Sequence, residues 1–363
     1  MFDRAHYVPI LKGKQAEYLA LRELPDSVKD GFTPLVEIPS IPYDFVKERP
    51  AKTIKQHVEK VAENLEKGWG SNRPVFVDFD FIPPSEVLPD GSQPLKFVFD
   101  QGRAKELLLV PVTGTDRDIA YQNAVKEAND KDRLGICFRL AGEDFDDMTD
   151  LQSTLEAQFK HFKIKAHQAD AIIDFESIAN VPTSTVLLAA KSILTGLPFL
   201  RDWRTLTFAG SAFPQDLQRM PAQSVTPVPR TEWQAWLTLA ANKHRLIRLP
   251  AFGDYGIAHP IPNEMDPRIM KMSAQLRYAT DTDWLVFKER GAVKHGFDQF
   301  NKICRDLTVR AEYKGAAFSA GDKAINTCAS PGSNSGNAQV WRRIGTNHHL
   351  TLVVDQLASV PGL

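Results

Sequence analysis

The strongest constraint on the fold is a repeat: eight short apolar runs, each bounded by turn residues and followed by a stretch with helical periodicity. The runs are HYVPILK from His6, FTPLVEI from Phe32, PVFVDFDF from Pro74, LLLVPVTG from Leu107, RLGICFRL from Arg133, ADAIIDFES from Ala169, RTLTFAGS from Arg204 and RLIRLPAF from Arg245. Between them, stretches such as 53–68 and 149–167 return apolar residues every three or four positions. This alternation predicts parallel βα units.

A repeat of roughly 34 residues, sustained over about 240 residues, predicts an α/β protein with a (β/α)8, TIM-barrel-like fold. An open, doubly wound parallel sheet is the alternative. The barrel is favoured because eight units are present and the first strand continues as ILKGKQAE, which is no G-x-G-x-x-G turn. We expect residues 1–270 to form the barrel. Residues 271–363 are expected to form a C-terminal helical extension packed on it rather than an independent domain.

Composition narrows the classes of function. The chain carries 44 basic and 45 acidic residues, so its net charge gives no support to nucleic-acid binding. Its three cysteines are widely spaced and lack a C-x-x-C pair, which predicts neither a disulfide framework nor a cysteine zinc site. The N-terminus does not resemble a signal peptide, and no apolar run approaches the ~18 residues of a membrane span. We therefore expect a cytoplasmic protein without membrane association.

Candidate site residues lie where the predicted strands end, because active sites of βα barrels form at the carboxyl ends of the strands. The polar residues at these ends are Lys12, Glu37, Asp78, Asp80, Arg139, Asp174, Glu176, Ser211, Asp254 and Tyr255. We predict that they face one common mouth.

Acidic residues dominate this set. Asp78 and Asp80, like Asp174 and Glu176, are two positions apart, a spacing that places both members on one face of a strand. We predict that they converge with Glu37 as the catalytic group. The four paired carboxylates, Asp78, Asp80, Asp174 and Glu176, could hold Mg²⁺ or Mn²⁺, or could divide into a general acid and a general base. The alternative is structural: each carboxylate caps a helix or pairs with a neighbouring cation.

Basic residues at the predicted mouth indicate the charge of the substrate. Lys12 and Arg139 would face an anionic ligand such as a phosphate group. The segment VWRRIGTNHH adds Trp341, Arg342, Asn347 and His348 as candidate substrate-binding residues. His348 and His349 are adjacent, so they point in different directions and are not expected to chelate one metal together.

The stretch FGDYG follows the eighth predicted strand. We expect it to form the last loop of the rim and to present Asp254 and Tyr255 to the mouth or to a neighbouring segment. The C-terminal WRRIGTNHH is the expected neighbour, since the remaining chain must pack on an existing surface to bury Trp341.

Several of these pieces together resemble one known family. The stretches YVPILKGKQAEYLAL, PLVEIP, FAGSAFP, FGDYG, GDKAI and WRRIGTNHH resemble the Beta protein family of bacteria and their phages, over nearly the full chain. The resemblance implies a phage-related or antiviral defence setting and names no reaction. Two functions are expected: a metal-assisted, phosphodiesterase-like hydrolase acting on a nucleotide or nucleic acid, or a non-catalytic sensor or adaptor that has a protein partner in a defence system.

Overall fold

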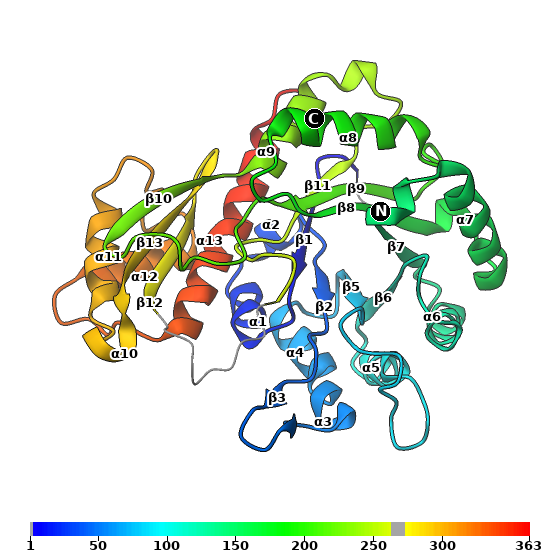
Figure 1. Cartoon of the computed structure of the whole chain (residues 1–363), viewed down its shortest axis with the longest axis horizontal. Coiled ribbons are helices and arrows are strands. Elements are labelled where there is room, and N and C mark those ends of the chain that lie inside the picture. The colour runs from blue at the N-terminus through cyan, green and yellow to red at the C-terminus, as the bar shows by residue number, and fades with distance from the viewer. Residues whose placement is uncertain (1–2, 263–272) are drawn as a thin grey trace.

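The chain forms a closed barrel of eight parallel strands (Figure 1). The computed structural model describes residues 3–262 and 273–363. The strands are β1 (Tyr7–Leu11), β2 (Leu35–Glu37), β5 (Pro74–Asp78), β6 (Leu108–Thr113), β7 (Ile136–Ala141), β8 (Ala169–Ser177), β9 (Thr205–Ser211) and β11 (Ala251–Asp254). β1 pairs with both β2 and β11, which closes the ring. The predicted barrel is confirmed, and the open sheet is excluded.

Helices cover the outside of the barrel. They are α1 (Gln15–Arg22), α2 (Asp26–Lys29), α3 (Ile54–Val58), α4 (Val61–Gly68), α5 (Pro94–Arg103), α6 (Ile119–Asp132), α7 (Met148–Phe162), α8 (Thr183–Gly196) and α9 (Thr231–Ala241). Asp118 and Asp147 accept backbone N–H bonds at the starts of α6 and α7, which satisfies donors that a helix start leaves free. The helix expected over 53–68 is broken into α3 and α4.

The long C-terminal helix α13 (Ala338–Ser359) takes the place of the helix that should follow the eighth strand. It packs against α1 and β1 of the barrel and also against β12 (Ser273–Ala279) and α12 (Ala320–Ala329). An ion pair of 2.6 Å between Arg343 and Glu23 ties it to the end of α1. Within the described part of the chain, α13 included, no helix combines the length and apolarity needed to cross a bilayer.

A second group of elements stands beside the barrel (Figure 1). β10 (Ser224–Pro229), β13 (Asp283–Gly291) and β12 form an antiparallel sheet, and α10 (Ala292–His295), α11 (Gln299–Thr308) and α12 follow β13 in sequence. The group has its own apolar cluster, which includes Phe287, Phe300 and Trp341. The division at residue 270 stays a prediction, and this sheet takes strands from both sides of it. A two-stranded ribbon of β3 (Tyr43–Asp44) and β4 (Arg49–Pro50) lies apart.

Candidate functional site

Alternation along the strands places one polar layer at the carboxyl end of the barrel interior. The interior residues form one apolar cluster: Val8, Ile10, Leu35, Phe76, Val110, Val112, Cys137, Ile172, Ala209 and Tyr255. Two positions after an interior residue, a strand again faces inward. That rule turns Glu37, Asp78, Arg139 and Asp174 into the barrel, directly above Leu35, Phe76, Cys137 and Ile172.

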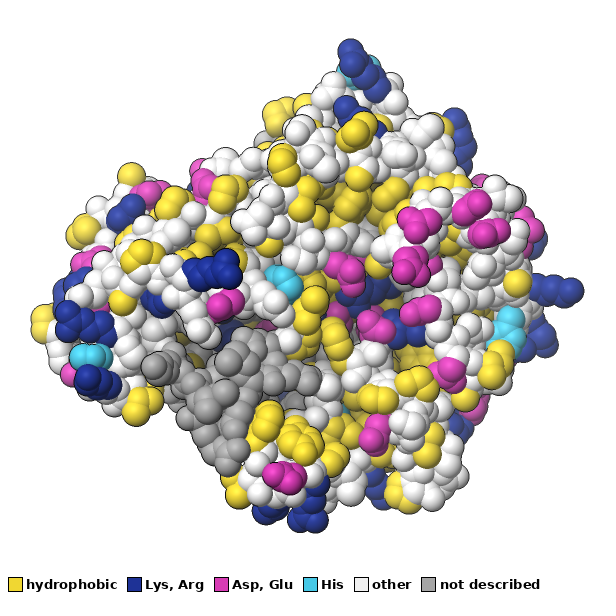
Figure 2. Space-filling view, viewed as in Figure 1, with side chains coloured by type: hydrophobic (Ala, Val, Ile, Leu, Met, Phe, Trp, Pro, Cys, Tyr) yellow, Lys and Arg dark blue, Asp and Glu magenta, His cyan; other side chains and the backbone are white. Residues whose placement is uncertain are grey.

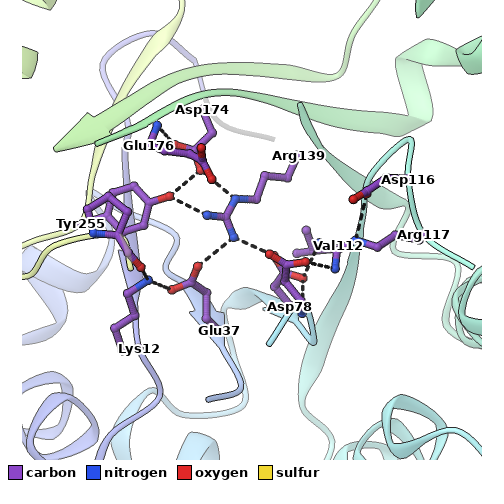
Figure 3. Close-up of polar contacts among 12 residues, drawn as sticks. Lys12, Glu37, Asp78, Val112, Asp116, Arg117, Arg139, Asp174, Glu176 and Tyr255 are labelled. Atoms are coloured by element: carbon purple, nitrogen blue, oxygen red, sulfur yellow. Dashed lines mark hydrogen bonds and ion pairs between the residues drawn. The ribbon is translucent and has the colours of Figure 1, made fainter. Parts of the chain in front are cut away.

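Arg139 is the centre of this layer (Figure 3). Its Nη1 donates to Glu37 at 2.8 Å and to Asp78 at 2.9 Å, and its Nε donates to Asp174 at 2.8 Å. All three carboxylates are buried. The convergence of carboxylates that the sequence predicted is therefore present. They gather around a guanidinium, although Arg139 was expected to face a ligand.

Lys12 and Tyr255 complete the layer. Lys12 pairs with Glu37 at 2.5 Å and also donates to the carbonyl of Pro260. The Tyr255 hydroxyl accepts from Arg139 Nη2 at 2.5 Å and donates to Asp174 at 2.6 Å. Every one of these side chains is therefore held in place by at least two polar contacts.

Burial and pairing act in opposite directions on the pKa values. Burial opposes the charge of Asp78, but Arg117 and Arg139 outweigh burial and lower its pKa. For Glu37, burial dominates and raises the pKa in spite of Arg139 and Lys12. Burial also opposes the charge of Arg139, whereas its contacts with Tyr255 and the carboxylates raise its pKa well above the ordinary value.

The members of each carboxylate pair differ in burial, since Asp78 and Asp174 are buried while Asp80 and Glu176 are exposed. Asp78 accepts the backbone N–H of Asp80 at 3.1 Å, and Asp174 accepts that of Glu176 at 2.8 Å. Each first carboxylate thus closes a turn on the residue two positions later: β5 ends at Asp78, and the pairing of β8 shifts register between Asp174 and Ser177. Asp80 lies beyond β5, and Glu176 has a positive φ of 50°. Each pair is therefore separated in depth: the first carboxylate is buried in the layer and the second is exposed.

Asp80 and Glu176 instead lie at the mouth, above the buried layer. The Asp80 side chain is 42% exposed and pairs with Arg117. Glu176 is exposed, and its carboxylate accepts no hydrogen bond from another residue of the described chain. Burial and the charge of Asp174 raise the pKa of Glu176, and burial and the charge of Asp78 raise that of Asp80.

A cleft of about 640 Å³ opens at this mouth. Its lining includes Asp80, Asp116, Arg117, Arg139, Glu143, Asp144, Asp146, Asp147, Asp150 and Glu176. Figure 2 shows carboxylates gathered around a hollow with basic side chains between them. The rim is acidic and the floor carries guanidinium groups.

The side chains of Asp254 and Tyr255 point in opposite directions, because neighbouring residues of an extended chain face opposite sides. Phe252, Gly253 and Asp254 lie in β11 rather than in a rim loop, so that expectation is wrong. Tyr255 faces the barrel interior. Asp254 faces outward, where it accepts from the Tyr7 hydroxyl at 2.5 Å and contacts His349 Nε2 at 2.8 Å. The predicted contact between FGDYG and the C-terminal segment is thus present, although it does not shape the mouth.

The other C-terminal candidates lie away from the mouth. His348 is buried between Asp322 and the carbonyl of Ala279, at 2.8 Å from each. Asn347 accepts from the N–H of Gly321 and donates to the carbonyl of Ala20. His348 and His349 contact different carboxylates, as their adjacency predicted. Trp341 stacks on Phe300 and, with Arg342, lines a separate small cavity.

Arg117 is the site residue that the sequence analysis missed. It lies in the loop after β6, outside the strand-end rule, and donates to both Asp78 and Asp80. The only available signal for Arg117 was its place in TGTDRD, directly after a predicted strand.

Two more buried charges, Arg230 and Glu232, lie near Asp254 around α9, and burial raises the pKa of Glu232 to about 8.

The arrangement of the inner carboxylates suits a guanidinium. The oxygens of Asp78 and Asp174 already receive bonds from Arg139 and from backbone N–H groups. Within residues 3–262 and 273–363, no group of three or more His, Cys, Asp or Glu side chains is arranged to hold a metal ion. At the rim, by contrast, the carboxylate of Glu176 receives no hydrogen bond from a described residue.

The fold and the site define a TIM-barrel protein with a charged layer at the carboxyl ends of its strands. The chain belongs to the Beta protein family, whose family model matches residues 7–355. No curated protein sequence matched the chain. Among solved structures, it is similar to triosephosphate isomerase from Bartonella henselae, with 11% identity and a TM-score of 0.34, over 68% of this chain and 91% of that chain.

Proposed function

We propose that the barrel mouth is the site of a metal-assisted hydrolase that acts on a phosphate-bearing substrate, such as a nucleotide or nucleic acid. The observation that carries the proposal is the pair of rim carboxylates, Asp80 and Glu176. Both line the cleft, and both have raised pKa values because burial and a second carboxylate oppose their charge. A bound cation would relieve this repulsion.

The donor set at the rim suits Mg²⁺ or Mn²⁺. Magnesium is commonly held by one or two carboxylates together with water and substrate phosphates. In this proposal Asp80 and Glu176 hold the cation, while Glu37, Asp78 and Asp174 position Arg139. A bound divalent cation would polarise the phosphoryl group and lower the pKa of a water molecule.

Arg117 and Arg139 have a second role in the proposal. Both guanidinium groups line the cleft while their carboxylate partners lie beneath or beside them. A phosphate bound at the rim would therefore approach two fixed positive charges that need no rearrangement. Such preorganised charges stabilise the negative charge that develops during phosphoryl transfer.

Hydrolysis of bis(4-nitrophenyl) phosphate in the presence of Mn²⁺ tests the proposal. Glu176→Gln keeps the shape but loses the charge, so we expect a loss in kcat/KM of about 100-fold or more. Glu156→Gln is the matched control, since Glu156 is exposed on α7 and does not line the cleft. A chain with no metal-dependent turnover, or Glu176→Gln with wild-type turnover, would contradict the proposal.

The raised pKa of Glu176 gives this activity a pH dependence. Only the ionised carboxylate binds a cation, so activity should fall as the pH is lowered through this pKa, above the ordinary value of about 4.3. A raised folded-state pKa also means that Glu176 favours folding below its unfolded pKa and that this stability is lost as the pH rises. Glu176→Gln should therefore not lower the melting temperature at neutral pH.

A recognition module is the second candidate, and the pairing within the inner layer favours it. Arg139, Lys12 and Arg117 are each paired with buried carboxylates, which gives a rigid floor rather than a reactive one. Such a protein would bind its ligand without turnover and signal to a protein partner in a defence system. For both candidates we propose a cytoplasmic location, where thiols such as the buried, free Cys137, Cys304 and Cys328 stay reduced.

A further inference from the structure

A second cavity lies in the group of elements beside the barrel. Along β12, Ser273, Gln275 and Arg277 alternate with Ala274, Leu276 and Tyr278, which belong to the apolar cluster of that group. The three polar residues therefore share one face of the strand. They line a cavity of about 70 Å³. Arg342 of α13 and the rings of Phe300 and Trp341 also line this cavity.

Within residues 3–262 and 273–363, Arg277 is a charged group without a counter-ion. Its Nη1 donates to the carbonyl of Ile257 at 2.5 Å, and its guanidinium lies 4.5 Å from the centre of the Phe213 ring. Among the ion pairs of the described residues, none involves Arg277 or Arg342. Burial and repulsion from Arg342 lower the pKa of Arg277.

This pairing of like charges is unusual, because charges withdrawn from water are normally neutralised by a partner. Two arginines at one cavity instead form a local excess of positive charge. Gln275 adds a second unsatisfied group, since its buried Oε1, an acceptor, has no hydrogen-bond donor among the described residues. Within the described part of the chain, the site therefore lacks a negative charge for the two arginines and a donor for Gln275.

We infer that this cavity binds an oxyanion of phosphate type between the guanidinium groups of Arg277 and Arg342. The Ser273 hydroxyl and the Gln275 Nε2 group lie on the same wall and would donate to the phosphate oxygens, while Gln275 Oε1 would accept from the P–OH group of a hydrogen phosphate. Planar guanidinium groups match the oxygens of a phosphate, and charge-assisted bonds of this kind are about twice as strong as neutral ones. The rings of Phe300 and Trp341, 4.6 Å apart and stacked, keep water from one side.

The size of the cavity limits the ligand. A volume of about 70 Å³ is small for a ligand cavity, since pockets for drug-sized molecules measure roughly 300–1,000 Å³. It suits a compact group such as one phosphate better than a nucleoside. The bound group is either free phosphate or the terminal phosphate of a larger molecule whose remainder lies outside the cavity.

The site is independent of the proposed function. None of the residues that line this cavity lines the acidic cleft at the barrel mouth. The two sites also differ in sign, because the rim is rich in carboxylates and this cavity is rich in guanidinium groups. A phosphate bound here is therefore held without a divalent cation.

Titration calorimetry with inorganic phosphate, in the presence of EDTA, tests the inference on the full chain. We expect one site per chain and at least a tenfold loss of affinity in Arg277→Met, with a smaller loss in Arg277→Lys. Arg305→Met is the matched control, since Arg305 is exposed on α11. Glu176→Gln should bind phosphate as the wild type does, which separates this site from the mouth.

Two further arms complete the test. Arg342→Met removes the second guanidinium group, on α13, and should also weaken binding, which covers the case that Arg277→Met fails to fold. Phenyl phosphate distinguishes the sources: tighter binding than inorganic phosphate favours the terminal group of a larger molecule, and weaker binding favours free phosphate. Absence of binding at millimolar phosphate, or unchanged affinity in both arginine variants, overturns the inference.

Discussion

Arg139→Met is expected to destabilise the fold by about 3–5 kcal/mol at neutral pH, the usual cost of removing one partner from a buried ion pair. The substitution keeps the apolar stem but leaves Glu37, Asp78 and Asp174 in the barrel without their shared guanidinium. Since small domains are stable by only about 5–15 kcal/mol, the change takes much of the total. Urea denaturation followed by circular dichroism measures it.

Two comparisons make this experiment specific. Arg139→Lys keeps the charge without the fork of donors, so its loss should be smaller. Arg219→Met, at an exposed position, should leave stability unchanged. Without Arg139, burial raises the carboxylate pKa values, and stability from a raised pKa is present at low pH and lost as the pH rises. The deficit of Arg139→Met should therefore shrink on acidification. A variant as stable as the wild type at neutral pH would refute the role of Arg139.

Deleting helix α13, by ending the chain at Asn337, is expected to abolish cooperative folding. The helix buries Ile344, Leu350, Leu352 and Val353 against the rest of the protein. Each such side chain contributes about 1.5–3 kcal/mol, so together they rival the whole stability of a domain. Soluble yield and a melting curve measure the outcome.

A shorter deletion provides the control. Ending the chain at Ser359 removes only the last residues beyond α13 and should leave folding intact. His349→Gln tests the polar contact alone, because it removes the imidazole that faces the buried Asp254. A cooperatively melting barrel without α13 would mean that this helix is an accessory.

The strands of the barrel could be predicted from the sequence because each is a short apolar run followed by turn residues. The last strand shows the limit. Its run was expected from Arg245, but β11 begins at Ala251 and residues 243–245 form a 3-10 helix. The eighth helix could not be predicted in its place, since about 80 residues of other structure separate β11 from α13. Nothing in the sequence after β11 indicates that a helix so much later in the chain packs back onto the barrel.

The candidate site could also be predicted only in part. The convergence of Glu37, Asp78 and Asp174 follows from the strand-end rule. The central position of Arg139 does not follow from this rule. The rule says that the side chain points into the barrel, but not how far it extends or which carboxylates it contacts. The separation of Asp80 from Asp78 depends on a turn hydrogen bond that a D-x-D string does not specify. Asp254 was misplaced although its adjacency to Tyr255 already required opposite faces.

The central claim is that the rim carboxylates Asp80 and Glu176 form a cation site above a buried layer in which Arg139 and Lys12 are paired with carboxylates. Calorimetric titration of Mn²⁺ into the full chain tests this claim most directly. The wild type is expected to bind one Mn²⁺, Glu176→Gln and Asp80→Asn to lose at least tenfold in affinity, and Glu156→Gln to bind normally. Wild-type protein that binds no Mn²⁺, or rim variants that bind it unchanged, would contradict the claim.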